Sequence, residues 1–245
     1  MSDGGRPAGA RKLPAGFVFH GVVAAGGRGE RFGGETPKQF LELDGVTIVA
    51  LSVGCLLSAG AESVVVALPS DAPESIREEL LVSDKVRIVD GGSTRQASVA
   101  AALASSPAAA TEFVAVHDGA RPATSIEDVL AVVLAARPSG AAILGRSVSD
   151  TLKRTAGGRV VTTVDRDHLF RAETPQVFRR ELLERAYESA RAACYVGTDE
   201  SSLVERLDGV EIAAVEAVHP NPKLTQPADL GRLRRMLVAS GRADA

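Results

Sequence analysis

Short apolar runs alternate with helical patterns over most of the chain. The runs, which read as buried strands, cover 17–24, 64–68, 86–89, 113–116 and 141–144. Between them, segments such as 48–56 and 126–133 carry apolar residues at the spacing of a helix. This alternation predicts a parallel sheet with helices on both faces. We therefore expect an α/β domain with a Rossmann-like, mostly parallel sheet.

The alternation breaks between about residues 147 and 177. The run 159–164 is rich in β-branched residues, and Gly157-Gly158 before it is a hairpin-turn signal that pairs it with 150–153. A two-stranded ribbon is marginal alone in water, so it should pack against something. The pattern predicts a β-arm over about 147–170, inserted in a single domain that spans 17–245.

A glycine-rich loop follows the first predicted strand. It reads Ala25-Gly26-Gly27-Arg28-Gly29-Glu30-Arg31-Phe32, and Pro37-Lys38-Gln39 comes soon after it. Glycines at the end of a strand let backbone N–H groups approach a phosphate chain, because no side chain intervenes. The loop also brings two fixed positive charges, Arg31 and Lys38. Two cations over one triphosphate favour chemistry at phosphorus, where moving charge must be neutralised.

Other phosphate-binding motifs do not fit this loop. A dinucleotide fingerprint needs glycine where Phe32 stands, and a Walker A loop needs a Gly-Lys pair, which the chain lacks. An NAD-dependent oxidoreductase is therefore disfavoured. An ordinary glycine-rich turn with solvated cations, or a nucleotide-binding module without catalysis, remains the alternative for the loop alone.

Three distant motifs fall at the ends of predicted strands. They are the Gly27 loop, Asp90-Gly91-Gly92 and Asp118. Ligands of open parallel sheets bind beyond the carboxyl ends of the strands. The three motifs should therefore meet at one rim and form one site.

Bulk properties are those of a globular enzyme. The chain has 245 residues and a net charge of −3, which argues against a nucleic-acid-binding surface. Its two cysteines make no disulfide framework, and no apolar run approaches the ~20 residues of a membrane span. Residues 1–16 lack an apolar core and are expected to be a disordered tail rather than a signal peptide. We expect a cytoplasmic protein with no nucleic-acid or membrane partner.

A family resemblance is carried by motifs that follow one another along nearly the whole chain. They are Gly27-x-Gly29-x-Arg31 with Pro37-Lys38-Gln39-Phe40, Asp90-Gly91-Gly92 with Arg95 and Ser98-Val99, Val116-His117-Asp118-Gly119-Ala120-Arg121-Pro122, Asp150-Thr151-Leu152-Lys153, Thr163-Val164-Asp165-Arg166, Thr174-Pro175-Gln176, Thr198-Asp199-Glu200, and Asn221-x-Lys223-x-Thr225. Together they resemble the signature of the 2-C-methyl-D-erythritol 4-phosphate cytidylyltransferases, which use CTP in the non-mevalonate isoprenoid pathway. Each motif is weak alone, but their shared order is specific.

The resemblance implies a transfer reaction. The phosphate of methylerythritol phosphate would attack the α-phosphorus of CTP and release pyrophosphate. This nucleophile is already an anion near neutral pH, so no general base is needed, and catalysis should be positioning plus charge stabilisation. By resemblance, Arg31 and Lys38 stabilise the transition state, while Arg166 and Lys223 position the methylerythritol phosphate.

The resemblance also assigns binding residues. CTP would be held by Ala25, Gly26, Gly27, Gly29, Gly92, Ser93, Ser98, Asp118 and Arg121. Methylerythritol phosphate would be held by Thr151, Arg166, Thr174 and Lys223. The implied cofactor is Mg²⁺ or another divalent cation, with Asp118 as its candidate ligand. An N-cap or a partner for Arg121 is the alternative role of Asp118.

In the resembled family the β-arm embraces a second subunit. The resemblance thus implies a homodimer with shared active sites, in which Arg166 serves the partner's site. A local appendage without a partner is the alternative.

Some positions depart from the family pattern. Gly26 and Gly119 stand where alanine is usual, and Ser93 stands where a carboxylate is often found. The loop 219–223 lacks an acidic residue before Asn221 and contains two prolines. A related cytidylyltransferase that uses ribitol 5-phosphate or another alcohol phosphate remains the alternative substrate assignment.

Overall fold

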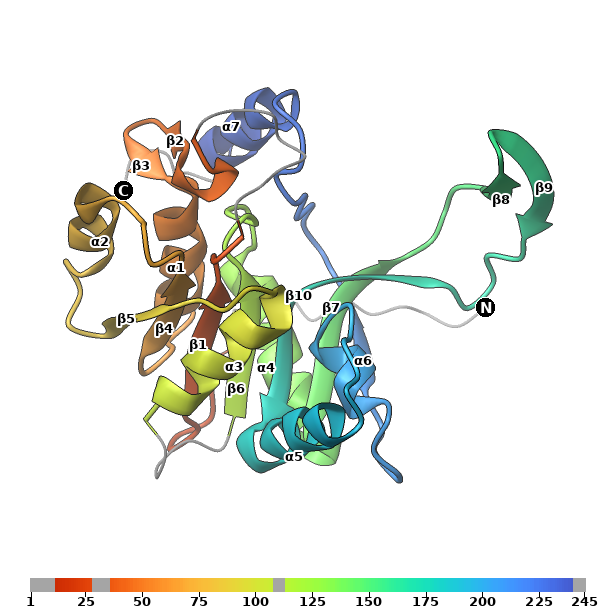
Figure 1. The fold of residues 1–245 in the computed structure, drawn as a ribbon, viewed down its shortest axis with the longest axis horizontal. Coiled ribbons are helices and arrows are strands. Elements are labelled where there is room, and N and C mark those ends of the chain that lie inside the picture. Colours follow the sequence, from red (N-terminus) through yellow and green to blue (C-terminus); the bar gives the residue numbers. More distant parts are fainter. Residues whose placement is uncertain (1–11, 28–35, 108–112, 240–245) are drawn as a thin grey trace.

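The computed structural model describes residues 12–27, 36–107 and 113–239. A seven-stranded sheet lies at its centre, in the order β11-β7-β10-β6-β1-β4-β5 (Figure 1). Its strands are β1 (Phe19–Ala24), β4 (Val64–Leu68), β5 (Val86–Asp90), β6 (Phe113–Asp118), β7 (Ala141–Ser147), β10 (Phe170–Arg179) and β11 (Ala213–Glu216). β10 runs antiparallel to both of its neighbours, and the other pairs are parallel. The predicted mostly parallel sheet is confirmed.

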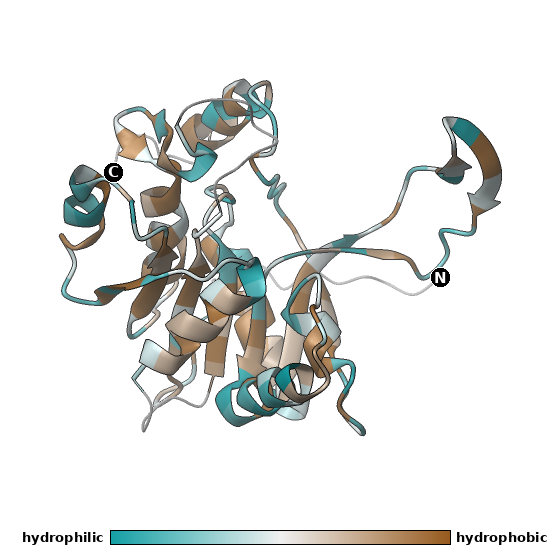
Figure 2. Cartoon of the chain, in the orientation of Figure 1, coloured by the Kyte–Doolittle hydropathy of each residue, from teal (hydrophilic) through white to brown (hydrophobic). Residues whose placement is uncertain are grey.

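Helices cover both faces of this sheet. On one face lie α1 (Ile48–Ser58), α2 (Glu74–Leu80) and α4 (Ile126–Ser139), and on the other lie α3 (Arg95–Ser105), α5 (Arg180–Ala192) and α6 (Glu200–Val204). Side chains alternate between the faces along each strand. In β1, Val23 packs into the first layer and Val22 into the second. Burial of apolar strands on both faces explains their nearly continuous hydrophobic sequences, which appear brown in Figure 2.

A third apolar cluster holds the carboxyl-terminal part of the chain. In helix α7 (Asp229–Ala239), Leu233 and Leu237 share this cluster with Leu224 and with Leu43 of β2 (Glu42–Leu43). Strand β2 forms a short hairpin with β3 (Val46–Thr47). The same region contains the 3₁₀ helix η2 (Lys38–Phe40). This cluster therefore brings the Lys38 segment and the 221–225 loop together, although they lie far apart in the sequence.

The β-arm extends away from the rest of the protein (Figure 1). Strands β8 (Leu152–Ala156) and β9 (Arg159–Val164) pair antiparallel, and Gly157 and Gly158 turn between them with φ of +54° and +74°. These are left-handed conformations that glycine adopts without strain. Val160 and Val161 are 65% and 60% exposed on the arm. The predicted ribbon is present, and its apolar residues are not covered by its own chain.

The sequence pattern does not predict strands β10 and β11. β10 contains Glu173, Thr174 and Gln176, all of which are buried, so its sequence lacks the apolar run of a buried strand. The segment in which the strand–helix alternation breaks therefore leads into β10 at Phe170, where the arm returns to the central sheet.

The amino-terminal segment is described only from Lys12. Leu13 packs against the first apolar layer, and the Phe17 N–H donates to the Pro14 carbonyl at 3.0 Å. The predicted tail, 1–16, thus includes residues that contact the domain, and residues 1–11 lie outside the described part. Among the described residues, none of the helices combines the length and hydrophobicity needed to cross a membrane.

Candidate active site

A cleft of about 390 Å³ lies at the carboxyl edge of the sheet. It is lined by the ends of β1 and β6, the start of α3, the η2 segment and the 223–225 loop; the lining residues are Ala24, Ala25, Gly26, Gly27, Lys38, Gln39, Gly92, Ser93, Thr94, Arg95, Ser98, Asp118, Gly119, Ala120, Lys223 and Thr225. We call it the central cleft. The three motifs expected at one rim therefore do meet there.

The glycine loop is held close to α3 by its lack of side chains. A Cβ on Gly26 would lie 2.7 Å from Ser98 Oγ, and one on Gly92 would lie 2.4 Å from Ala97 Cβ. A Cβ on Gly119 would lie 2.8 Å from the Ala25 Cβ. An alanine at 26 or 119 would therefore require Ser98 or Ala25 to shift. A Cβ on Gly27 would have no described atom within 4 Å, and Gly27 is exposed, so it does not crowd the cleft from the described side.

Gln39 fixes this loop, a role that the sequence reasoning did not assign. The side chain is buried, and its Nε2 donates to the Ala25 carbonyl at 2.9 Å and to the Gly27 carbonyl at 2.6 Å. These two hydrogen bonds hold the backbone of the loop in place where it lines the cleft. The only signal in the sequence was its place beside Lys38 in the Pro37-Lys38-Gln39 motif.

We expect the Gln39→Met variant to bind CTP, the nucleotide that the family resemblance implies for this cleft, more weakly. Methionine keeps the length of the side chain but cannot donate, so two loop carbonyls lose their partner at about 1–3 kcal/mol for each unsatisfied group. The KM for CTP should rise about tenfold or more, with a smaller change in kcat. Gln226→Met, at an exposed glutamine, is the matched control. An unchanged KM for CTP in Gln39→Met would contradict this role.

Two lysines face the central cleft from different elements. The Lys38 Nζ donates to the Leu224 carbonyl at 2.7 Å, which anchors η2 to the carboxyl-terminal loop. The Lys223 Nζ lies 2.8 Å from Asp118 Oδ2. Both ammonium groups are therefore held in place by the fold.

The Asp118 carboxylate is surrounded by three cationic side chains. The Arg95 Nε lies 3.1 Å from its Oδ1, and the Arg121 Nε and Lys223 Nζ lie 3.3 and 2.8 Å from its Oδ2. Burial would raise the pKa of this carboxyl, but Lys223, Arg95 and Arg121 together hold the pKa well below its usual range. Asp118 is therefore ionised, and it pairs with Arg121, which is one of the alternative roles that the sequence left open.

Arg95 connects Asp118 to a buried acid on α6. The Arg95 Nη1 lies 2.8 Å from the Glu200 carboxylate, and the Tyr187 hydroxyl donates to Glu200 Oε1 at 3.0 Å. Burial raises the pKa of Glu200, and burial beside this carboxylate raises the pKa of Tyr187. Burial alone would lower the pKa of Arg95, but Glu200 and Asp118 raise the pKa above its usual value and fix the guanidinium between them. Sequence reasoning noted Arg95 and Glu200 in motifs but gave neither a role.

His117 and Thr174 lie directly beneath Asp118. His117 is fully buried, and burial lowers its pKa to about 4, so the imidazole is neutral. The His117 Nδ1 lies 2.9 Å from Thr174 Oγ1, and its Nε2 lies 3.1 Å from the Arg121 carbonyl. The Asp118 N–H donates to the same Thr174 hydroxyl at 3.1 Å.

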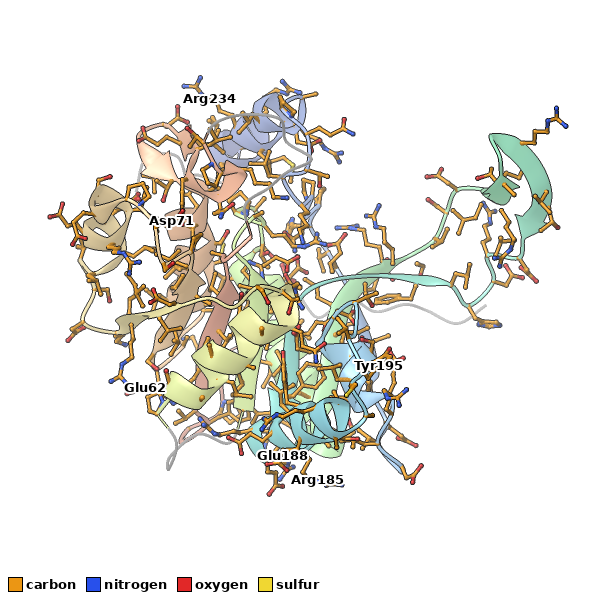
Figure 3. All side chains as sticks on the ribbon, viewed as in Figure 1. Glu62, Asp71, Arg185, Glu188, Tyr195 and Arg234 are labelled. Atoms are coloured by element: carbon orange, nitrogen blue, oxygen red, sulfur yellow. The ribbon has the colours of Figure 1, made fainter. Side chains whose placement is uncertain are left out.

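Two further hollows adjoin the central cleft across Asp118 and Lys223. The side hollow, of about 210 Å³, is lined by Arg95, Asp118, Arg121, Ala172, Glu173, Thr174, Gln176, Thr198, Asp199 and Lys223. The basic hollow, of about 450 Å³, is lined by Arg121, Arg146, Arg171, Ala172, Glu173, Pro220, Asn221, Pro222, Lys223, Thr225 and Arg232. Figure 3 shows polar side chains crowded at this edge of the sheet, far from Arg185 and Glu188 on α5.

Most predicted binding residues lie at these hollows. The central cleft includes Ala25, Gly26, Gly27, Gly92, Ser93, Ser98 and Asp118 of the predicted CTP site, together with Lys38 and Lys223. Arg121 lines the side hollow rather than the central cleft, and Thr174 lies there too. Gly29 and Arg31 lie outside the described residues.

Two predicted residues lie away from the cleft of their own chain. Thr151 and Arg166 are exposed and belong to the β-arm. The Arg166 Nη1 donates to the Ser149 carbonyl at the base of the arm. The structure therefore does not bring these two side chains to the cleft that contains Lys38.

The acidic side chains leave limited choices for a metal ion. Among residues 12–27, 36–107 and 113–239 there is no group of three or more His, Cys, Asp or Glu side chains that could hold one. Asp118 is the acidic residue among those that line the central cleft. A carboxylate offers about four acceptor positions, and three cations occupy three of them. Mg²⁺ is typically bound by one or two carboxylates plus substrate phosphates, so this donor set fits it.

The chain is similar along most of its length to proteins of one known family. A family model described as 2-C-methyl-D-erythritol 4-phosphate cytidylyltransferase matches residues 19–238. The chain is 40% identical over 222 residues to the protein of that name from Acidobacterium capsulatum, covering 85% of this chain and 92% of the relative. It is also 40% identical over 224 residues to the one from Solibacter usitatus, covering 85% and 91%.

Solved structures of the same name have the same fold. The crystal structure of 2-C-methyl-D-erythritol 4-phosphate cytidylyltransferase from Thermus thermophilus has a TM-score of 0.75 at 33% identity and covers 90% of this chain and 98% of its own. The one from Francisella tularensis has a TM-score of 0.77 at 29% identity and covers 90% and 100%.

Proposed function

The chain belongs to the 2-C-methyl-D-erythritol 4-phosphate cytidylyltransferase family, and on this premise we propose where its two substrates bind. The enzyme transfers the cytidylyl group from CTP to 2-C-methyl-D-erythritol 4-phosphate. The products are 4-diphosphocytidyl-2-C-methyl-D-erythritol and pyrophosphate. We propose that CTP occupies the central cleft and that the alcohol phosphate occupies the adjoining hollows.

This assignment rests on residues that line both the central cleft and the side hollow. Asp118 and Lys223 border both the central cleft and the side hollow, while Lys38 borders the central cleft from η2. A phosphate that enters beside Lys223 would thus meet the α-phosphate of a nucleotide in the central cleft. The entering phosphate forms a bond to phosphorus as the bond to pyrophosphate breaks, and no proton needs to move.

The cleft provides charge and orientation for this step. Lys38 of η2, with Arg31 of the glycine-rich loop, would neutralise charge that builds on the phosphoryl oxygens, and Lys223 would hold the entering phosphate. The cytosine base would be read by backbone near Ala25, Gly26 and Gly92, because hydrogen bonds distinguish bases and stacking does not. Ser93 and Ser98 border the same end of the cleft.

Mg²⁺ or another divalent cation would be held by Asp118 together with the triphosphate. When bound, the ion supplies further neutralisation of phosphate charge. The roles of Lys38 and Lys223 do not depend on which ion is present, since both are fixed by contacts within the chain.

We propose further that the β-arm completes the site of a second copy of the chain. Val160 and Val161 are more than half exposed on the arm, and a two-stranded ribbon gains stability by packing. Thr151 and Arg166 would then contact the alcohol phosphate bound to the partner. The functional unit would be a homodimer with shared active sites. A cytoplasmic location stays a prediction.

The substrate assignment is tested by pyrophosphate release. With CTP and Mg²⁺, we expect release with methylerythritol phosphate and little with ribitol 5-phosphate. Phosphate-free methylerythritol is the control, because it lacks the attacking anion and should give no product. Release with ribitol 5-phosphate alone would instead favour the alternative alcohol phosphate.

A further inference from the structure

Four groups form a closed chain of hydrogen bonds beneath the turn that carries Asp118 and Arg121. The Asp118 N–H donates to Thr174 Oγ1 at 3.1 Å, Thr174 Oγ1 lies 2.9 Å from His117 Nδ1, and His117 Nε2 lies 3.1 Å from the Arg121 carbonyl. His117 and Thr174 are both buried. This series of hydrogen bonds therefore connects both ends of the 118–121 turn to the neighbouring strand β10.

The contacts in this series are direct and buried. The Arg121 carbonyl can only accept, so His117 Nε2 carries a proton. The Thr174 hydroxyl oxygen accepts the Asp118 N–H on one side and contacts His117 Nδ1 on the other. The Thr174 hydroxyl therefore has partners within the protein on both sides.

Thr174 also supports the loop that carries Lys223. Its backbone carbonyl accepts a hydrogen bond from Asn221 Nδ2 at 2.8 Å, and Asn221 Oδ1 accepts from Thr124 Oγ1 at 2.8 Å. The Arg121 Nη1 donates to the Asn221 carbonyl at 2.7 Å. One residue of β10 therefore connects both elements that border the proposed site of the alcohol phosphate.

We propose that His117 and Thr174 are positioning residues that set Asp118 and Arg121. This inference rests on the proposed function, since it concerns the turn placed between the two substrates. It gives Thr174, which the family resemblance placed at the alcohol phosphate, a second task within the protein. His117, to which the sequence assigned no role in catalysis, becomes part of the site's support.

A double-mutant cycle tests this proposal. Thr174→Val keeps the shape and the backbone carbonyl but removes the hydroxyl, and His117→Gln keeps a donor near Arg121 but loses the contact with Thr174. We expect each to lower kcat/KM by about 10- to 100-fold, because small displacements at a reacting centre cost up to about 10² in rate. Thr174→Ser, which retains the hydroxyl, should stay within about threefold of the wild type.

The decisive quantity is the double variant. If both residues act through the same series of hydrogen bonds, adding His117→Gln to the Thr174→Val variant should lower kcat/KM little further. If the fold-losses of kcat/KM in the two single variants multiply in the double variant, Thr174 acts independently of His117 and the proposal is wrong. Near-normal activity of His117→Gln would also overturn it. Should Thr174→Val not fold, His117→Gln and His117→Asn decide alone: lowered kcat/KM in both supports the proposal, and normal values in both overturn it.

Matched controls separate positioning from loss of a buried polar group. His20→Gln removes a second buried histidine that is bonded to Ser63, and Ser52→Ala removes a buried hydroxyl bonded to the Ile48 carbonyl. Both should keep normal kcat/KM even if they melt at lower temperature. Wild-type activity is measured in the same series: if the wild type does not release pyrophosphate, the proposed function fails, whereas multiplying losses in an active enzyme reject only the positioning role.

Discussion

The Lys38→Ala variant should lose kcat by a factor on the order of 10²–10³, with a smaller change in the KM for CTP. The Lys38 Nζ borders the central cleft and is anchored to the Leu224 carbonyl at 2.7 Å, so the charge is in place before substrate arrives. A positive charge that is fixed before substrate binds stabilises the transition state most strongly, because negative charge is redistributed over the phosphoryl oxygens there. The measurement is steady-state pyrophosphate release with each substrate varied in turn.

Two further variants make this result specific. Lys85→Ala removes an exposed lysine ahead of β5 and should be indistinguishable from the wild type. Arg31→Ala should resemble Lys38→Ala if the loop cations act together. A Lys38→Ala enzyme with near-normal kcat and a raised KM for CTP would show that Lys38 binds the ground state, and the transition-state role would be wrong.

Mixing the inactive variants Arg166→Ala and Lys38→Ala should restore part of the lost activity. In a mixed dimer, one site would combine the intact Lys38 of one chain with the intact Arg166 of the other. Arg166 is exposed on the arm in the structure, whereas Lys38 lines the cleft of the domain, so the two can be supplied by different copies. At most one of the two sites in a mixed dimer recovers.

The control mixture is Lys38→Ala with Lys223→Ala. Both lysines border the same cleft of one chain, so each site in that mixed dimer lacks one of them and activity should stay lost. Subunit exchange must first be demonstrated, for example by mass spectrometry of the mixture, because extensive interfaces exchange slowly. If exchange occurs and the Arg166→Ala mixture stays inactive, Arg166 does not act across the interface. A monomer in sedimentation at assay concentration would reject the shared site.

The local pattern of the sequence predicted much of the sheet. Strands β1, β4, β5, β6 and β7 were each marked by a short apolar run. In β1, β4 and β6 the reason is burial on both faces, which requires apolar residues along the length of the strand, whereas the edge strand β5 is only partly buried. β10 could not be found in this way. Its buried Glu173, Thr174 and Gln176 have partners on other segments, namely Arg146 on β7, His117 on β6 and Asp199 ahead of α6.

The sequence by itself determined most strands of the central sheet and the meeting of three motifs at one rim, because both follow from local spacing and from the rule for parallel sheets. Only the tertiary structure decided which polar groups meet. Lys223 and Asp118 are 105 positions apart, as are Arg95 and Glu200, and Gln39 faces loop carbonyls that carry no sequence signal. Periodicity reports which face of an element is buried, whereas partners across the fold depend on how those faces pack.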